Sequence, residues 1–425
     1  MTDDLWNALG EVSGKPVKKM MDTWTKQTGY PIVSVTAKND ALALAQERFL
    51  YTHKKDKTQW HIPLAVREGN KTTYAEMNSK KITLMTNKVT INPSHVGFYR
   101  VEYDTLLLDN QKKQFAKMAI LDKASLQGNQ YALARGGYAS IQEFLDLAPL
   151  YKEETDYTLW AEIAANLGEI KFLFAHTPLK EGLDTFTREL TAPILKKLGW
   201  DEKAGEEHTT ILLRATILGA TGLSDDQSVI KEAQRRFEQH VKNKNLNPNL
   251  RSVVYSLAAR NGGRKEYDQL KQLYRDATLQ EEKVRLLAAL GMFRQEELLN
   301  ETLAFTLTPE VRTQDTMIGM TRVASNSYGT VLAWDFFKKN WDEFKKRYGD
   351  GGHIIGRLIK ELCSKFATPE KAKDIENFFK SHPMPSAKRA IEQSLEAIRI
   401  NHAFVEKSRK EIEGWMKRPT SPSYG

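Results

Sequence analysis

The stretch WDFFKKNWDEFKKRY, residues 334–348, is typical of the structure that most of this chain should adopt. Its aromatic side chains recur at intervals of three and four residues, at Trp334, Phe337, Trp341, Phe344 and Tyr348. Such intervals place side chains on one face of an α-helix, and an apolar face of this kind predicts packing into a core. Core packing is favoured over the alternative, an aromatic platform that stacks on nucleic-acid bases.

Helical spacing continues on both sides of this stretch, from about residue 105 to the end of the chain. Thr308-Pro309-Glu310 and Thr368-Pro369-Glu370 each offer a capping hydroxyl, a first-turn proline and an acid, which predicts a helix start at both places. Glycine pairs such as Gly262-Gly263 predict helix ends. So many helices with short breaks favour an α-helical superhelix of the HEAT or armadillo type over a single bundle.

The period changes between residues 30 and 106. Trp60, Ile62, Leu64 and Val66 alternate with other residues, and several similar short runs are separated by turn signals. Alternation with period two predicts half-buried strands, and short strands at close spacing predict a small antiparallel β-sandwich. Pro63 lies inside one run, so we expect it on an edge strand or at a bulge.

Residues 1–29 have helical spacing but are too few to bury two tryptophans. We therefore expect either the tail of something larger or a segment docked on a neighbour, and we expect Trp6, Met20, Met21 and Trp24 to form an apolar patch for a partner. The predicted fold class is α+β and mainly α. Its predicted parts are the helical remnant 1–29, the β-sandwich 30–106 and the helical superhelix 107–425.

The composition excludes some classes of function. The chain has 425 residues, and 63 basic against 54 acidic residues give a net charge of +9. This excess is too dilute to predict nucleic-acid binding without a clustered stripe. No apolar run approaches the length of a membrane span, so we expect no membrane partner. The single cysteine, Cys363, fits a reducing compartment, and we expect a cytoplasmic protein in which Cys363 is a buried hydrophobe.

The residues show no catalytic centre and no metal site. None of the nine histidines belongs to an H-E-x-x-H motif, and no nucleophile elbow, P-loop or dinucleotide fingerprint is present. Glu206-Glu207-His208 could suggest an acid–base pair, but a solvated helix start is favoured because neighbouring helical residues point in different directions. The glycine-rich stretch at 349–352 could bind an anion, although a plain turn between helices is favoured.

Several short motifs, in this order, resemble the part of zinc aminopeptidases that follows their catalytic domain. The resemblance is greatest to the puromycin-sensitive aminopeptidase family, and it spans essentially the whole chain. The motifs are WTKQTGYP at 24–31, VGFYR at 96–100, ALARG at 132–136, LGWD at 198–201, EVRTQDT at 310–316, GRLIK at 356–360 and FKSHP at 379–383.

The resemblance implies the C-terminal half of such an enzyme, without the zinc-bearing catalytic domain. This chain then binds no cofactor, whereas the complete enzyme holds zinc and hydrolyses the N-terminal residue from peptide substrates. The missing catalytic half is expected to dock on residues 1–29 and on the concave face of the helices, and this chain alone should be inactive. The alternative is a freestanding α-solenoid scaffold that binds peptides or proteins without catalysis.

Two positions gain a role or a question from the resemblance. Arg357 matches a family position where an arginine can face the substrate chamber, so it is the one substrate-binding residue that we expect; a surface arginine is the alternative. Asp122-Lys123 departs from the Asp-Arg that relatives usually show. Lysine cannot reproduce a bidentate ion pair of that arginine, which puts the local packing in question.

Overall fold

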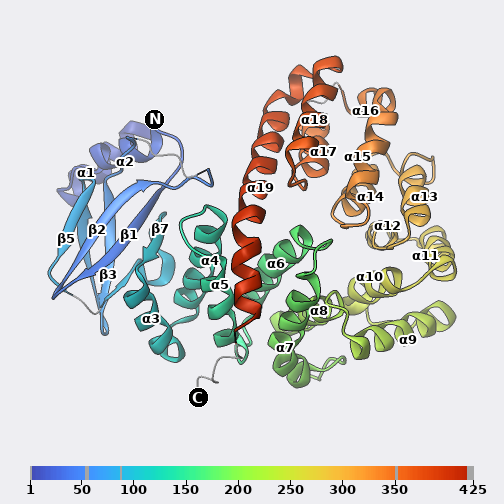
Figure 1. Ribbon diagram of the computed structural model, residues 1–425, viewed down its shortest axis with the longest axis horizontal. Coiled ribbons are helices and arrows are strands. Elements are labelled where there is room, and N and C mark those ends of the chain that lie inside the picture. The colour runs from blue at the N-terminus through green and yellow to red at the C-terminus, as the bar shows by residue number, and fades with distance from the viewer. Residues whose placement is uncertain (1, 53–56, 87–88, 350–352, 419–425) are drawn as a thin grey trace. The chain divides into compact units, whose positions relative to one another are not determined.

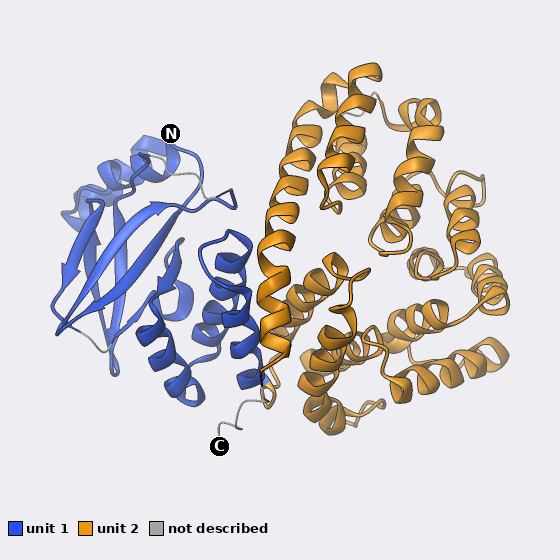
Figure 2. Ribbon diagram, in the orientation of Figure 1, with its two compact units in different colours: residues 1–151 blue, residues 152–425 orange. Residues whose placement is uncertain are grey.

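The computed structural model describes residues 2–52, 57–86, 89–349 and 353–418. The chain forms two compact units, residues 1–151 and 152–425, shown in blue and orange in Figure 2. Unit 1 contains two β-sheets and several helices, whereas the described part of unit 2 is helical (Figure 1). The predicted fold class, α+β and mainly α, is confirmed. The division at residues 29/30 and 106/107 remains a prediction.

The strands of unit 1 form two sheets that share one core. Within the described residues, one sheet has the order β5-β2-β1-β7 and the other has the order β4-β3-β6. The strands are β1 (Pro31–Lys38), β2 (Ala41–Arg48), β3 (Ile62–Glu68), β4 (Lys71–Met77), β5 (Lys81–Leu84), β6 (Val89–Ile91) and β7 (Arg100–Tyr103).

Alternate residues of the two sheets make the predicted core. Val33 and Leu44 from one sheet, and Ile62 and Leu64 from the other, are at most 1% exposed. The strands that carry these residues therefore bury one face between the sheets, as the period of two requires. Trp60, which is fully buried, fills the same core.

Two details differ from the predicted antiparallel sandwich. β7 pairs with β1 in parallel, because the chain passes through the other sheet before it returns to the first. β4 was not predicted, since its residues are largely exposed and its polar sequence gives no alternation. Pro63 lies in β3, the middle strand of its sheet. β6 pairs with β3 only at residues 66–68, so the missing N–H of Pro63 removes no hydrogen bond to β6.

Five α-helices complete the described part of unit 1. They are α1 (Thr2–Ser13), α2 (Val17–Thr25), α3 (Thr105–Gln114), α4 (Ile120–Arg135) and α5 (Ile141–Leu147). α2 is anchored by Trp24, whose Nε1 donates to the carbonyl of His61 at 2.9 Å and whose ring lies 6.2 Å from that of Trp60. The tryptophan therefore joins α2 to the sandwich.

The apolar patch expected near the N-terminus differs in its members. Trp6, Met20, Met21 and Trp24 are all half-buried, because α1 and α2 pack on each other and α2 packs on the sandwich. The exposed apolar side chains are those of α1, where Leu5, Leu9 and Val12 are 52%, 45% and 90% exposed. α1 has no buried residue at all, so its apolar side chains are free for contact.

The question about Asp122-Lys123 has a local answer. Asp122 is buried at the start of α4 and accepts from Arg67 Nη2 of β3 and from the Ser94 N–H, both at 2.7 Å. The Lys123 ammonium lies 4.9 Å from the centroid of the Phe115 ring. Asp122 therefore takes its counter-ion from Arg67, and Lys123 packs beside Phe115.

Unit 2 is a succession of helices, each packed on its neighbours. They are α6 (Tyr157–Leu173), α7 (Lys180–Leu198), α8 (His208–Gly222), α9 (Gln227–Asn243), α10 (Arg251–Asn261), α11 (Arg264–Asp276), α12 (Gln280–Leu290), α13 (Glu296–Thr306), α14 (Thr316–Ala324), α15 (Thr330–Lys339), α16 (Trp341–Tyr348), α17 (His353–Cys363), α18 (Pro369–Ser381) and α19 (Lys388–Met416).

These helices form the predicted superhelix. α6, α8, α10, α12 and α14 contact one another in that order and make one layer. The path curves so far that the end of α19 returns to α7 (Figure 1). There the Phe186 and Trp415 rings lie 4.9 Å apart, and Met416 lies against Gly182, where a Cβ would come within 2.5 Å of its sulfur.

The aromatic stripe at 334–348 is buried as predicted, with each of its five rings at most 7% exposed. It is shared by α15 and α16, which are separated at Asn340. The Asn340 side chain donates to the carbonyl of Phe336 at 2.9 Å, and such local bonds compete with helix continuation. The face persists across the break because both helices pack on the same core.

Only one of the two predicted helix starts is correct. α18 begins at Pro369, with the Thr368 hydroxyl accepting from the Lys371 N–H. No helix begins at Pro309. Thr308 instead donates to the carbonyl of Phe305 at 2.8 Å, at the end of α13, so the preceding helix uses this hydroxyl.

Candidate functional site

Arg357, the substrate-binding residue expected from the sequence, lies on α17. Its neighbours Gly356 and Leu358 are buried, and Gly356 packs against Ala390 of α19. Arg357 itself is exposed and makes no hydrogen bond or ion pair with any described residue. It is therefore available for contact with another molecule, and its role in substrate binding remains a prediction.

The other residues considered from the sequence have structural roles or lie outside the residues that the structure describes. Glu206 accepts two hydrogen bonds at 2.7 Å from Arg214, which is fully buried. This ion pair holds the start of α8 and is not an acid–base pair. Burial of Cys363 raises the pKa of its thiol, as expected of a buried hydrophobe. Of the stretch 349–352, residues 350–352 lie outside the described residues.

A polar cluster that the sequence did not predict lies in unit 2. The turns that follow α6, α8, α10, α12 and α14 converge because these helices curve together. His176 Nε2, in the first of these turns, lies 3.0 Å from the carbonyl oxygen of Ser327 in the last. Its ring is 5.5 Å from that of Tyr328, edge to face. Residues 151 positions apart are thus neighbours.

Ion pairs connect the same turns. Lys171 and Lys180 lie 3.3 and 2.6 Å from the Asp184 carboxylate. Lys180 also reaches Asp225 at 2.9 Å, and Asp225 forms an ion pair with Arg294. We call this group, together with Arg260, His176 and Tyr328, the turn cluster.

Arg260, at the end of α10, is the member of the turn cluster without a partner. It makes no ion pair with any residue that the structure describes, and its Nε is buried without a hydrogen bond. Burial, and then the nearby charge of Arg294, lower the pKa of Arg260, with Asp225 acting in the opposite direction. A guanidinium in this position is held at a cost in free energy.

The charges of the turn cluster do not balance. Four cations, Lys171, Lys180, Arg260 and Arg294, face two anions, Asp184 and Asp225. Although burial opposes it, the hydrogen bond from Lys180 and the charge of Arg294 lower the pKa of Asp225. Both carboxylates are thus already used by lysine and by arginine.

The turn cluster is also accessible. The Arg294 side chain is 32% exposed and Tyr328 is 39% exposed. The accessible Arg294 guanidinium, beside the surplus positive charge of the turn cluster, can bind a carboxylate or another small anion, since guanidinium binds such groups through paired hydrogen bonds. The arrangement supplies binding, and it contains no nucleophile with an activating base.

Two further observations bear on chemistry. Within the described ranges, no group of three or more His, Cys, Asp or Glu side chains is arranged to hold a metal ion. The residues present therefore do not fit a zinc site. No described helix has the length and apolar character that crossing a membrane requires.

Known proteins similar to this chain are aminopeptidases. Aminopeptidase M1 of Arabidopsis thaliana is 32% identical and aligns with 96% of this chain but 50% of its own length. Aminopeptidase A of Gloydius brevicauda is 31% identical over the whole chain and 46% of its own length. The yeast protein "Aminopeptidase 2, mitochondrial" is 29% identical over 98% of the chain and 45% of its own length.

The chain thus spans about half the length of these relatives. The family model described as "ERAP1-like C-terminal domain" matches residues 89–400, which include the end of the β-sandwich and nearly all of the helices. This family model matches most of the chain, and the structure is a helical superhelix preceded by two small sheets. The chain therefore belongs to the ERAP1-like C-terminal domain family.

Proposed function

We propose that this chain is the C-terminal portion of a zinc aminopeptidase that removes N-terminal residues from peptides. The observation that carries the proposal is the share of each protein that aligns. The aminopeptidase relatives match nearly all of this chain and only about half of themselves. They do not favour the alternative of a freestanding scaffold.

Zinc and catalysis belong, in this proposal, to the other half of the enzyme. This sequence has no H-E-x-x-H motif, and its described residues do not fit a zinc site. The chain by itself should therefore neither retain zinc nor hydrolyse peptides. Its own contribution is to contact the peptide and to support the catalytic half.

The catalytic half is proposed to dock on residues 1–29 and on the concave helical face. Support comes from α1, where Leu5, Leu9 and Val12 are exposed on a helix without a buried residue. A partner that covers them would gain apolar burial. The cytoplasmic location is also part of the proposal, and the buried, unpaired Cys363 is compatible with it.

The proposal can be tested with the purified chain and a catalytic half bearing H-E-x-x-H, produced separately from a relative such as Aminopeptidase M1. We expect no hydrolysis of aminoacyl-fluorophore substrates by this chain alone and co-elution of the two halves in size-exclusion chromatography. The charged variant Leu9→Asp should weaken co-elution, whereas Asn7→Asp on the same helix serves as the matched control. Zinc-dependent turnover by this chain alone would refute the proposal.

Within this function, we propose that the turn cluster binds a carboxylate of the peptide. Its support is the surplus of two positive charges beside the accessible Arg294 and the unpaired Arg260. Arg357, exposed on α17, is proposed as a second, separate peptide contact. A carboxylate would neutralise part of the charge that the fold leaves uncompensated.

Matched peptides can test the turn cluster. A peptide with a free C-terminal carboxylate should raise the thermal midpoint of the chain more than the same peptide with a C-terminal amide, because only the former carries the anion. Arg260→Met should abolish the difference between the two peptides. Equal stabilisation by both peptides would mean that the turn cluster does not bind a carboxylate.

A further inference from the structure

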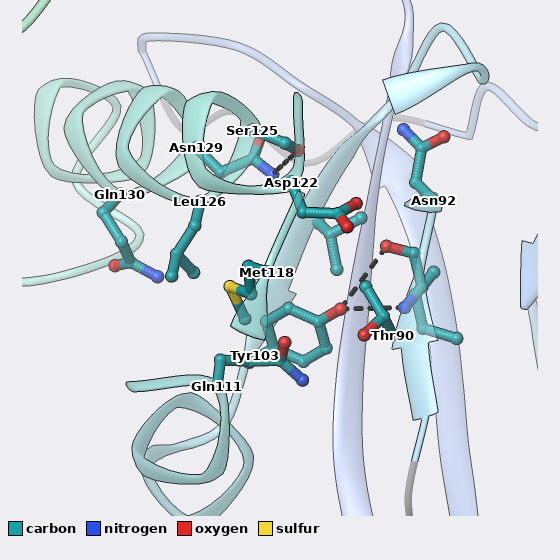
Figure 3. A pocket seen from close by; sticks show the side chains of 12 residues that line it. Thr90, Asn92, Tyr103, Gln111, Met118, Asp122, Ser125, Leu126, Asn129 and Gln130 are labelled. Carbon is teal, nitrogen blue, oxygen red and sulfur yellow. Dashed lines mark hydrogen bonds between the residues drawn. The ribbon is translucent and has the colours of Figure 1, made fainter. Parts of the chain in front are cut away.

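A small polar cavity lies inside unit 1, between β6, β7, α3 and α4, far in sequence from the turn cluster (Figure 3). Its volume is about 20 Å³. The side chains that line it include Thr90, Tyr103, Gln111, Asn129 and Gln130. Ile91, Val101, Met118 and Leu126 also line it, so polar and apolar residues meet at this cavity.

Some polar groups around the cavity are satisfied by the protein. Tyr103 Oη accepts from the Ile91 N–H at 2.9 Å and lies 3.4 Å from the Ile91 carbonyl oxygen. The Asp122 carboxylate is engaged by Arg67 and by the Ser94 N–H. These groups need no ligand.

The amide side chains on the α4 side are different. Gln130 is 1% exposed and makes no hydrogen bond with any residue in the described part of the chain, and its Oε1 is buried. Asn129 is 4% exposed; its Nδ2 donates weakly to Ser125 at 3.3 Å, and its Oδ1 is buried without a partner. On the α3 side, Gln111 Nε2 donates to the Val89 carbonyl at 3.3 Å.

A buried amide that forms no hydrogen bond is costly, and native proteins seldom leave one without a partner. The cavity has room for one water molecule, which needs about 10–15 Å³ by this measure, but not for a larger ligand. A cation has little reason to bind, because Arg67 already neutralises the nearest carboxylate, that of Asp122. Water can both donate to and accept from an amide.

We propose that this cavity is a binding site for one ordered water molecule, held by the Gln130 amide and by at least one further polar atom of the cavity lining. The water satisfies the buried Gln130 amide, and it explains why α4 carries Gln130 in a position where an apolar residue would be expected.

The first test is a high-resolution crystal structure of the full chain. We expect an electron-density peak about 3 Å from the Gln130 amide and from at least one further polar atom of the cavity. Absence of the peak would overturn the proposal. A peak with five or more oxygen neighbours at about 2.4 Å would overturn it as well, because those distances indicate a cation.

The second test is the sign of a stability change. Gln130→Met removes the amide that holds the water, so we expect the thermal midpoint to fall by roughly 2–4 °C. Gln114→Met, the same change at an exposed site of α3, should leave it unchanged. If the Gln130 amide were dry and unpaired, Gln130→Met would leave the midpoint unchanged or raise it, and the proposal would be wrong.

Discussion

Two buried polar groups, one in each unit, differ in how their charges are compensated. In unit 1, Arg67 meets Asp122 at 2.7 Å, and the carboxylate also accepts a backbone N–H, so charge and hydrogen bonds are complete. In the turn cluster of unit 2, four cations share two carboxylates, and Arg260 has no ion-pair partner in the described structure. Removing one partner of the complete pair would leave a buried charge uncompensated, whereas the incomplete group is suited to a ligand.

The largest effect is expected at the complete pair. Arg67→Met leaves the Asp122 carboxylate, 2% exposed, without its cation. Loss of one partner of a buried pair typically lowers the free energy of unfolding by about 3–5 kcal/mol, and urea denaturation should show a loss of that order. Lys265→Met, which removes one partner of an exposed pair, should cost less than about 1 kcal/mol. Similar losses in both variants would contradict the expected difference between a buried and an exposed ion pair.

A neutral buried group should make stability depend on pH. His240 accepts the Leu246 N–H on Nδ1 at 3.1 Å, and its Nε2 lies 2.8 Å from Tyr255 Oη, which donates to Glu282. Burial, and then the charges of Arg251 and Lys244, lower the pKa of His240 to about 4, against the opposing charge of Glu282.

The pKa of His240 in the folded protein is below its ordinary value of 6.5. The stabilisation that neutral His240 gives the folded state is therefore complete above pH 6.5. It is lost as the pH falls towards 4, by on the order of 3 kcal/mol in the free energy of unfolding. Urea unfolding at a series of pH values should show this loss in the natural chain and a smaller one in His240→Gln. Parallel pH profiles of the two proteins would contradict the assignment.

A change of opposite sign is expected at the incomplete cluster. Arg260→Met removes a partly buried cation that has no ion-pair partner in the described ranges, so the free energy of unfolding should stay the same or rise by about 1 kcal/mol. Arg409→Met, at an exposed position of α19, should change nothing. A loss of more than about 2 kcal/mol on Arg260→Met would show that Arg260 is a structural partner after all.

The smallest effect is expected at Arg357. Its side chain is exposed and unpaired within the described residues, so Arg357→Ala should alter the free energy of unfolding by less than about 0.5 kcal/mol. In the assembled two-half enzyme it should raise the KM for peptides while kcat stays unchanged. A stability loss above about 1 kcal/mol would point to a structural role instead.

Much of the fold could be predicted, and the misses have physical causes. The aromatic stripe at 334–348 predicted its core face correctly, since burial follows the helical period. It did not predict the break at Asn340, where a side chain competes with the backbone. The Thr308 hydroxyl, which was expected to cap a new helix, instead donates to the Phe305 carbonyl at the end of α13. β4 escaped because it is polar and exposed.

The candidate site was predicted less well. Arg357 came from a resemblance, and its exposure on α17 agrees with a surface position but does not test its role. The turn cluster gave no local signal, because its members come from the ends of several helices and from the turns between them, and each is ordinary alone. A search for charged residues that recur where successive helices end could have found Arg260 and Arg294.

By itself, the sequence determined the periods of helix and strand, the fold class and the lack of an H-E-x-x-H motif, because each of these depends on residues close together in the chain. Only the tertiary structure decided that Asp122 pairs with Arg67, that the turns of unit 2 converge and that Arg260 has no ion-pair partner among the described residues. Such contacts join residues tens to more than a hundred positions apart. They depend on the curvature of stacked helices and on sheet register. Both result from many weak contacts between distant segments, so neither can be inferred from one segment alone.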